Sequence, residues 1–238
     1  MSRLVSSLVI SVAAIAGCKK TVKTAEVESW VKQRTTELGI NASKVTCPKN
    51  IEAKEGKTFD CEVEVEGKTY TLVSTIKSVE GTNVKFDTAW KNQTTGVIIR
   101  SKLVPALTDE LSKRFATQVA ITCAEPLLFL DAARSLTCEL AAGAIKSKLA
   151  ITFDDKLAPT DWKLDPPLLS SAKIAETLQA AVREKTAPTV TVTCGTDPLI
   201  VRPADGVMTC DFTNGDKQAH VKANVTPDLK LTTWEVVP

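Results

Sequence analysis

The chain has 238 residues, of which 43% are hydrophobic, 5% aromatic and 24% charged. Thirty lysines and arginines against 28 aspartates and glutamates leave a net charge of +2, which argues against a nucleic-acid binder. The apolar fraction is that of a globular chain, which argues against wholesale disorder. A single histidine, His220, leaves little room for histidine-based catalysis or a histidine-rich metal site.

The N-terminus has the pattern of an export signal. Arg3 gives a positive start, residues 4–14 are apolar apart from serines, and small residues lead to Cys18. This order is typical of a secretory signal peptide. The apolar run is too short to span a bilayer comfortably.

The end of this signal, Ile15-Ala16-Gly17-Cys18, resembles the lipobox of bacterial lipoproteins. The resemblance implies that residues 1–17 are removed and that Cys18 carries diacylglycerol and an acylated amine, with palmitate as the expected chain. Several acyl chains on one residue anchor a protein firmly. We therefore expect a lipid anchor in the cell envelope, facing the periplasm or the exterior. Lys19 would favour the outer membrane in a Gram-negative host, and an ordinary signal peptide with an accidental cysteine is the alternative.

The rest of the chain repeats one pattern three times. Trp90, Trp162 and Trp234 are 72 residues apart. The six cysteines after Cys18 fall into three local pairs with similar neighbours, as in Val45-Thr46-Cys47, Ile121-Thr122-Cys123 and Val192-Thr193-Cys194. The repetition predicts units at 18–92, 93–166 and 167–238, with short junctions at 91–96 and 165–167 that keep the units in contact.

Each unit begins with a helical pattern. Apolar residues share one helix face from about Thr24 in the first unit, and the same spacing recurs in the other two. These residues are Val27, Trp30, Val31 and Leu38, then Val104, Leu107, Leu111 and Phe115, then Ile174, Leu178 and Val182 after a cap at Ser170 or Ser171.

After each helix the apolar period becomes two, which predicts strands with one wet face. In the first unit, Phe59, Cys61, Val63 and Val65 alternate with acidic residues, and Tyr70, Leu72, Ser74 and Ile76 continue the pattern to Val84 and Phe86. The predicted fold class is α+β. It consists of three tandem units, each with one helix packed on a small antiparallel sheet of three to four strands and one local disulfide.

Six cysteines permit fifteen pairings, and the repetition favours pairing within each unit. The expected disulfide residues are Cys47, Cys61, Cys123, Cys138, Cys194 and Cys210. Such a bridge would stabilise a thin core by roughly 3 kcal/mol. A simple hairpin at Glu55-Gly56 would place Cys61 opposite Asn50, so we expect a bulge or an irregular loop near residues 47–50.

The pattern Cys-Pro, about a dozen residues, then Gly-x-x-Phe-x-Cys resembles the bacterial domain-of-unknown-function family numbered 4333. The matching residues are Val45, Cys47, Pro48, Gly56, Phe59, Cys61 and Val63. The resemblance implies a helix-plus-sheet fold and a cell-envelope location, and it implies no activity. By looser analogy, tandem units with one disulfide each also build a secreted inhibitor of beta-lactamases.

Short motifs that could carry chemistry have simpler interpretations. Gly56-Lys57-Thr58 and Gly67-Lys68-Thr69 lack the rest of a phosphate loop and are typical of turns. Ser170-Ser171-Ala172-Lys173 has the spacing of a serine–lysine nucleophile motif, but helix capping explains it. Glu62, Glu64 and Glu66 indicate a solvated sheet face, with a cation site as the alternative.

Leu127-Leu128-Phe129-Leu130 is apolar on both faces, unlike its counterpart at 50–54. Two interpretations stay open: burial against a neighbouring unit, or an exposed patch for a protein partner. Together these features predict a lipid-anchored envelope protein that binds or scaffolds without catalysis or cofactor. Its expected partners are the membrane and an envelope protein, and not nucleic acid. The alternative is an inhibitor or sensor of an exported enzyme or ligand.

Overall fold

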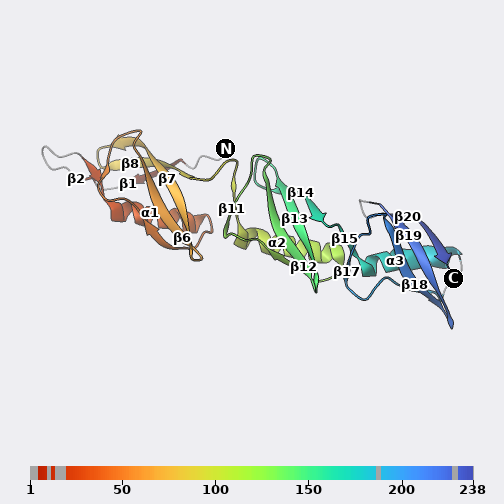
Figure 1. Cartoon of the computed structure of the whole chain (residues 1–238). Coiled ribbons are helices and arrows are strands. Elements are labelled where there is room, and N and C mark those ends of the chain that lie inside the picture. Colours follow the sequence, from red (N-terminus) through yellow and green to blue (C-terminus); the bar gives the residue numbers. More distant parts are fainter. Residues whose placement is uncertain (1–4, 10–11, 14–19, 186–188, 227–229, 238) are drawn as a thin grey trace. The chain divides into compact units, whose positions relative to one another are not determined.

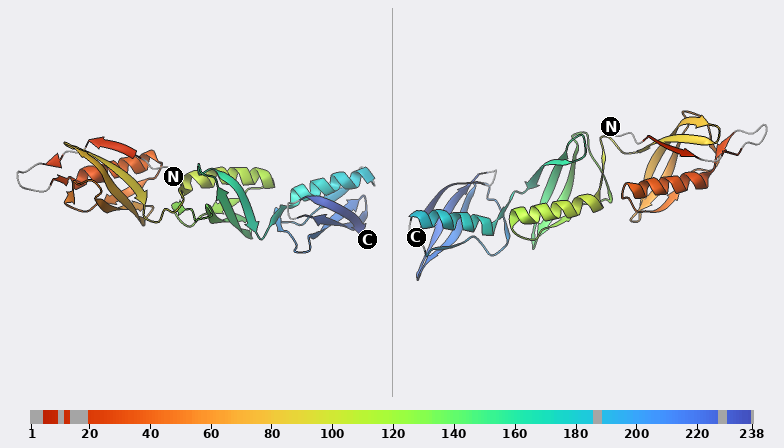
Figure 2. Two further views of the ribbon diagram at one scale, coloured as in Figure 1. Left: turned by 90° about the horizontal axis from the view of Figure 1, so that it is seen from above. Right: turned by 180° about the vertical axis from the view of Figure 1, so that it is seen from behind.

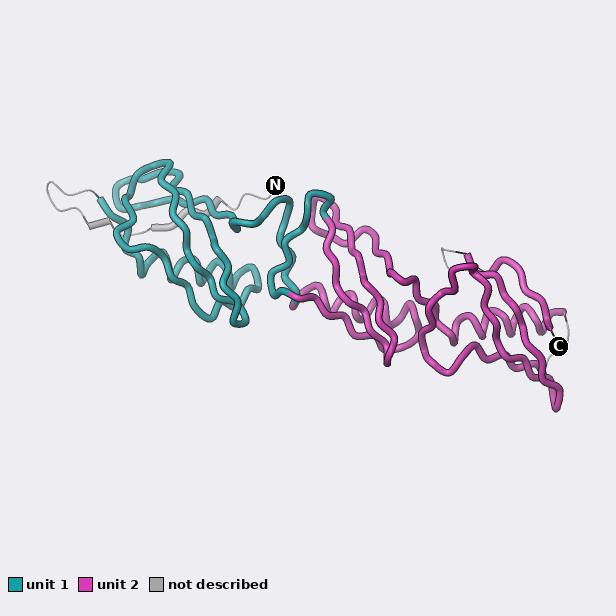
Figure 3. The backbone as a smooth tube through the Cα atoms, viewed as in Figure 1, with its two compact units in different colours: residues 1–100, 125–134 teal, residues 101–124, 135–238 magenta. Residues whose placement is uncertain are grey.

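The computed structural model describes residues 5–9, 12–13, 20–185, 189–226 and 230–237. Cys18 lies outside them. The chain forms two compact units, one of residues 1–100 with 125–134 and one of residues 101–124 with 135–238 (Figures 1 and 3). The described residues contain three helices and many antiparallel strands, so the fold is mixed but mostly sheet. The predicted mixture of helix and antiparallel sheet with three disulfides is confirmed at this level.

Unit 1 is built on a five-stranded antiparallel sheet in the order β1-β8-β7-β6-β4. The strands are β1 (Val5–Val9), β4 (Ala42–Thr46), β6 (Thr58–Val65), β7 (Lys68–Glu80) and β8 (Asn83–Trp90). A second sheet joins β2 (Val12–Ala13), β3 (Thr21–Val22) and β5 (Ile51–Glu52). Helix α1 (Thr24–Glu37) lies along one face of the larger sheet (Figure 2).

The core of unit 1 follows from the predicted periodicities. In β6 the residues Phe59, Cys61, Val63 and Val65 are buried, while Asp60 and Glu62 between them are exposed. Val27, Trp30 and Val31 on α1 are buried against them, and Leu38 packs on the core just after the helix ends. The predicted alternation and helix face are therefore confirmed here.

Unit 2 contains two further helices, each with a four-stranded antiparallel sheet. The first set is α2 (Arg100–Phe115, of which residue 100 belongs to unit 1) with the sheet β10-β12-β13-β14. Its strands are β10 (Ala120–Thr122), β12 (Ser135–Ala142), β13 (Ile145–Phe153) and β14 (Pro159–Asp165). On α2 the buried residue at the start is Leu103, where Val104 was predicted, followed by Leu107, Leu111 and Phe115.

The second set is α3 (Ser171–Lys185) with the sheet β16-β18-β19-β20. Its strands are β16 (Thr191–Thr193), β18 (Val207–Asn214), β19 (Lys217–Val225) and β20 (Leu231–Val237). Ile174, Leu178 and Val182 of α3 are buried, as predicted.

Two short ribbons complete the fold. Strands β9 (Val97–Ile99) and β11 (Leu127–Phe129) pair in unit 1, and β15 (Leu168–Ser170) pairs with β17 (Leu199–Val201) in unit 2. The predicted junction between residues 92 and 93 therefore falls inside unit 1.

The three evenly spaced tryptophans do not hold three equivalent positions. Relative to the second cysteine of each pair, Leu72, Leu149 and Val221 occupy the same cross-strand site. Trp90 lies opposite Leu72, whereas Trp162 and Trp234 lie opposite Ile151 and Ala223, two residues further along the strand. The longer β7–β8 hairpin displaces Trp90, which is buried in unit 1.

Candidate functional site

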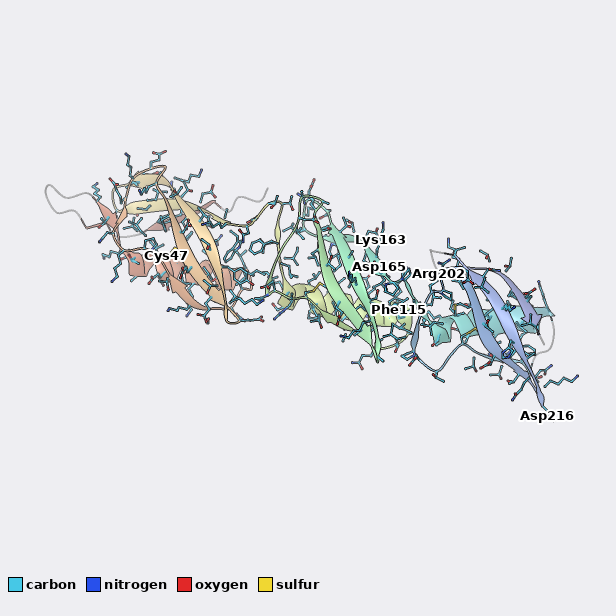
Figure 4. All side chains as sticks on the ribbon, in the orientation of Figure 1. Cys47, Phe115, Lys163, Asp165, Arg202 and Asp216 are labelled. Atoms are coloured by element: carbon cyan, nitrogen blue, oxygen red, sulfur yellow. A yellow bond between two sulfur atoms is a disulfide. The ribbon has the colours of Figure 1, made fainter. Side chains whose placement is uncertain are left out.

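The six predicted cysteines form three disulfides, Cys47–Cys61, Cys123–Cys138 and Cys194–Cys210. Each bridge joins the residue after a short first strand to the strand beside it. Because Thr46 pairs with Glu62, the next residue, Cys47, faces Cys61, and their Cα atoms are 4.3 Å apart. All six residues are buried (Cys47 is labelled in Figure 4), so each bridge ties adjacent strands from inside a core.

The irregular loop expected near residues 47–50 is present, and it explains how the bridge forms. After Cys47 the chain turns away from β6, and Asn50 has a positive φ of 58°. Strand β5 then pairs with β3 rather than with β6. The segment that a simple hairpin would have placed opposite Cys61 has therefore left the sheet, and β4 takes that place.

The apolar segment Leu127-Leu128-Phe129-Leu130 is mostly buried. Leu127, Leu128 and Leu130 are 1%, 8% and 1% exposed, and Phe129 is partly buried. Leu127 belongs to the core of unit 1, and Phe129 packs against that core with its ring 6.0 Å from that of Tyr70. Residues 127–130 are therefore buried or partly buried and do not form an exposed patch.

A polar cluster fixes the start of the same segment. The Glu125 carboxylate accepts a hydrogen bond from the Tyr70 hydroxyl at 3.0 Å and forms an ion pair with Lys68. Arg100 forms a second ion pair with Glu66, beside the β6–β7 turn. We call Glu66, Lys68, Tyr70, Arg100 and Glu125 the Glu125 cluster. Its two cations balance its two carboxylates, so it links parts of unit 1 without presenting a net charge.

Two ionisation equilibria in the cluster are displaced. Burial, and then the hydrogen bond to Glu125, raise the pKa of Tyr70 to about 12. The hydrogen bond from Lys68, and then that from Tyr70, lower the pKa of Glu125 below its ordinary value. Near neutral pH the cluster therefore holds a protonated phenol and a carboxylate, an arrangement suited to holding a segment in place.

The motifs singled out in the sequence have structural roles. Gly67 has a φ of 76° and follows Glu66 in the two-residue turn between β6 and β7. The Ser171 hydroxyl donates to the carbonyl of Asp197 at 2.7 Å, and the Ser170 hydroxyl accepts from the Lys173 backbone N–H at 3.4 Å. The serines at the start of α3 are therefore engaged with backbone groups.

The acidic row of β6 and the turn that follows it is divided between different partners. Glu64 accepts a hydrogen bond from the Ser43 hydroxyl at 2.9 Å, and Glu66 pairs with Arg100. His220 is exposed on β19, with its Nδ1 3.2 Å from a carboxylate oxygen of Asp211. Within the described ranges, no group of three or more potential metal ligands is found. No helix of that part is long and apolar enough to cross a membrane.

Comparison with known proteins gives a local match. Residues 5–81 are a DUF4333 domain, a domain of unknown function. The match spans β1 to β7, and with them the Cys47–Cys61 bridge. No curated protein and no solved structure matches the chain. The DUF4333 match agrees with the family resemblance carried by Cys47, Pro48 and Cys61.

Proposed function

We propose that this protein is a lipid-anchored component of the cell envelope, built from three copies of one helix-and-sheet module, which acts by binding or scaffolding. The observation that carries the proposal is the joint presence of an export-type N-terminus ending in Cys18 and three buried disulfides. Disulfides persist in oxidising compartments, which an exported chain reaches.

The three-copy part of the proposal is supported by strand order. The sheets β10-β12-β13-β14 and β16-β18-β19-β20 have the same order, and β4-β6-β7-β8 repeats it within unit 1. In each, the bridge joins the residue after the first strand of that order to the second strand. The non-catalytic part is supported by the engagement of the Ser170–Ser171 pair and of the Glu125 cluster in holding backbone and segments together.

The anchor is tested by growing cells that produce the tagged chain with labelled palmitate. We expect label on the native chain and none on Cys18→Ser, with the native chain in the membrane fraction. Cys47→Ser paired with Cys61→Ser is the matched control, because it removes two other cysteines and their disulfide without touching the lipidation residue. Equal labelling of native chain and Cys18→Ser, or no labelling of either, would refute the anchor.

The binding role is tested by crosslinking and capture from membranes, comparing the native chain with Cys18→Ser released from the membrane. We expect the native chain to retain a defined envelope protein. An inhibitor or sensor would instead retain its exported enzyme or ligand even when released. Capture of no protein by the membrane-bound chain would contradict both forms of the binding role.

A further inference from the structure

The strands β8, β14 and β20 are each last in a four-stranded arrangement, and they differ in whether another strand pairs with their outer edge. In unit 1 the edge of β8 is filled, because β1 pairs with it antiparallel from Val5 opposite Asp87 to Val9 opposite Asn83. In unit 2, β14 and β20 are each last in their sheet, and no described strand pairs with their outer edges. An unpaired edge presents backbone N–H and C=O groups to any extended chain.

The outer edges of β14 and β20 differ in how they are protected. Strand β14 begins with Pro159 and carries Asp161, Lys163 and Asp165 (the last two labelled in Figure 4), and prolines and charges discourage edge pairing. Strand β20, Leu-Thr-Thr-Trp-Glu-Val-Val, has neither proline nor glycine, and Glu235 is its one charged residue. Val236 of β20 is 40% exposed. The edge of β20 therefore lacks the protection that β14 has.

Unit 1 indicates which kind of strand fits this edge. The strand paired with β8 reads Val5-Ser6-Ser7-Leu8, an apolar residue, two hydroxyl residues and an apolar residue. Strand β20 begins with the same pattern, Leu231-Thr232-Thr233-Trp234. Strand β7 contains the same pattern in Val73-Ser74-Thr75-Ile76, but it is paired on both edges. Strand β20 carries the pattern at an edge that no described strand covers, so it can itself serve as the partner strand.

We propose that β20 pairs antiparallel with β20 of a second copy of this chain, joining two four-stranded sheets across a two-fold axis. A register centred on Trp234 places Glu235 opposite Thr233, so the one charge of the strand does not meet its own copy. Trp234 then lies opposite Trp234, and aromatic cross-strand pairs are favourable. An isologous pair of this kind closes at two copies.

The test measures the mass of the full chain carrying Cys18→Ser, which excludes both lipid and a thiol-linked dimer. One strand pair is a small interface, so we expect the dimer to be weak. The measurement therefore covers protein concentrations from about 5 to 200 µM. Sedimentation should move from the 25.6 kDa chain mass towards twice that value with concentration. A single species of chain mass throughout would overturn the proposal.

Two matched substitutions locate the contact. Thr232 and Thr160 are both exposed, and each hydroxyl donates to a carbonyl of the neighbouring strand at 3.2 Å, Asn224 and Thr152 respectively. Thr232→Lys should abolish the dimer, whereas Thr160→Lys on β14 should leave it unchanged. Persistence of the dimer in Thr232→Lys, or equal loss in both variants, would overturn the assignment. Val236→Lys repeats the test at a side chain with 40% exposure, in case Thr232→Lys does not fold.

Discussion

Ser74 and Ser147 are buried on central strands of their sheets, and they differ in whether the hydroxyl has a hydrogen-bond partner. Ser74 on β7 is 0% exposed and Ser147 on β13 is 3% exposed. The Ser147 hydroxyl donates to the Pro166 carbonyl at 2.7 Å, whereas that of Ser74 has no partner within the described part of the chain. A buried hydroxyl without a partner retains its desolvation cost.

We expect opposite effects of the same substitution at these sites. Ser74→Ala should raise the free energy of unfolding by about 1 kcal/mol, and Ser147→Ala should lower it by about 1 kcal/mol. Urea unfolding followed by tryptophan fluorescence measures both. Effects of the same sign would mean that the hydrogen-bond difference does not decide their stability.

Tyr70 is the chain's single tyrosine, so its titration can be followed without interference from another phenol. Its pKa of about 12 lies above the usual 10.0, so the stability it contributes is full below pH 10 and is lost as the pH rises through 12. Tyrosinate absorbance of the folded chain should therefore appear near pH 12. In Glu125→Gln the midpoint should fall towards, but not reach, the usual value, because burial remains. If the tyrosinate midpoint of Glu125→Gln equalled that of the native chain, the Tyr70–Glu125 hydrogen bond would be refuted.

Glu125 makes a prediction in acid. Its pKa is lowered first by the bond from Lys68, so its contribution is present above the ordinary carboxyl pKa and is lost as the pH falls through the lowered one. Native chain and Glu125→Gln should thus differ in unfolding free energy near neutral pH and converge in acid. Denaturant titrations at a series of pH values measure the difference, and a constant gap would contradict this account.

At the scale of elements, the β9/β11 ribbon is a structural part of unit 1. Leu127 is 1% exposed in its core, so Leu127→Ala should lower the free energy of unfolding by about 2–5 kcal/mol. Val201, on the corresponding strand β17, is 47% exposed, and Val201→Ala should change it by less than about 0.5 kcal/mol. Thermal and denaturant unfolding compare the two variants. A small effect of Leu127→Ala would show that the ribbon is dispensable.

Each disulfide closes a short loop between two strands. Replacing Cys123 and Cys138 together by alanine should cost about 3 kcal/mol, since their separation of 15 residues sets the loop entropy. The six cysteines are paired as disulfides, so they should give no thiol reaction in the absence of a reductant, whether the protein is folded or unfolded. Because the bridges are buried, a mild thiol reductant should release these thiols only after denaturation. Thiol titration with and without reductant, before and after denaturation, together with mass spectrometry of the bridged peptides, measures this. A disulfide that joins a cysteine of one pair to a cysteine of another pair would contradict the fold.

Much of this architecture could be predicted from local patterns. The period-two alternation of β6 and the helical face of α3 reflect which residues must be buried, and local sequence records that choice. The position of the irregular loop after Cys47 also followed from register arithmetic. The pairing of β5 with β3 did not, because two-residue strands leave no periodicity and their partner is chosen by tertiary contacts.

At the scale of the whole molecule, sequence repetition and compactness divide the chain differently. Repetition predicts three units, whereas residues 125–134 belong with unit 1 in space. Local sequence at Glu125 and Leu127 does not reveal this placement, because a leucine run indicates burial but not against what, and Glu125 forms its contacts with residues far away in sequence. Trp90 and Trp162 differ in register although their spacing in sequence equals that of Trp162 and Trp234, because the β7–β8 hairpin is longer.

Strand β1 gives the proposed maturation a consequence for the first sheet. If the cut falls before Cys18, as proposed, the peptide that departs is also the one that covers β8. The edge of β8 would be paired in the precursor, and cleavage at the membrane would expose it at the stage when the lipid is attached. Lys85 and Asp87 would then be the charged residues of β8 that discourage its exposed edge from pairing with strands of other chains.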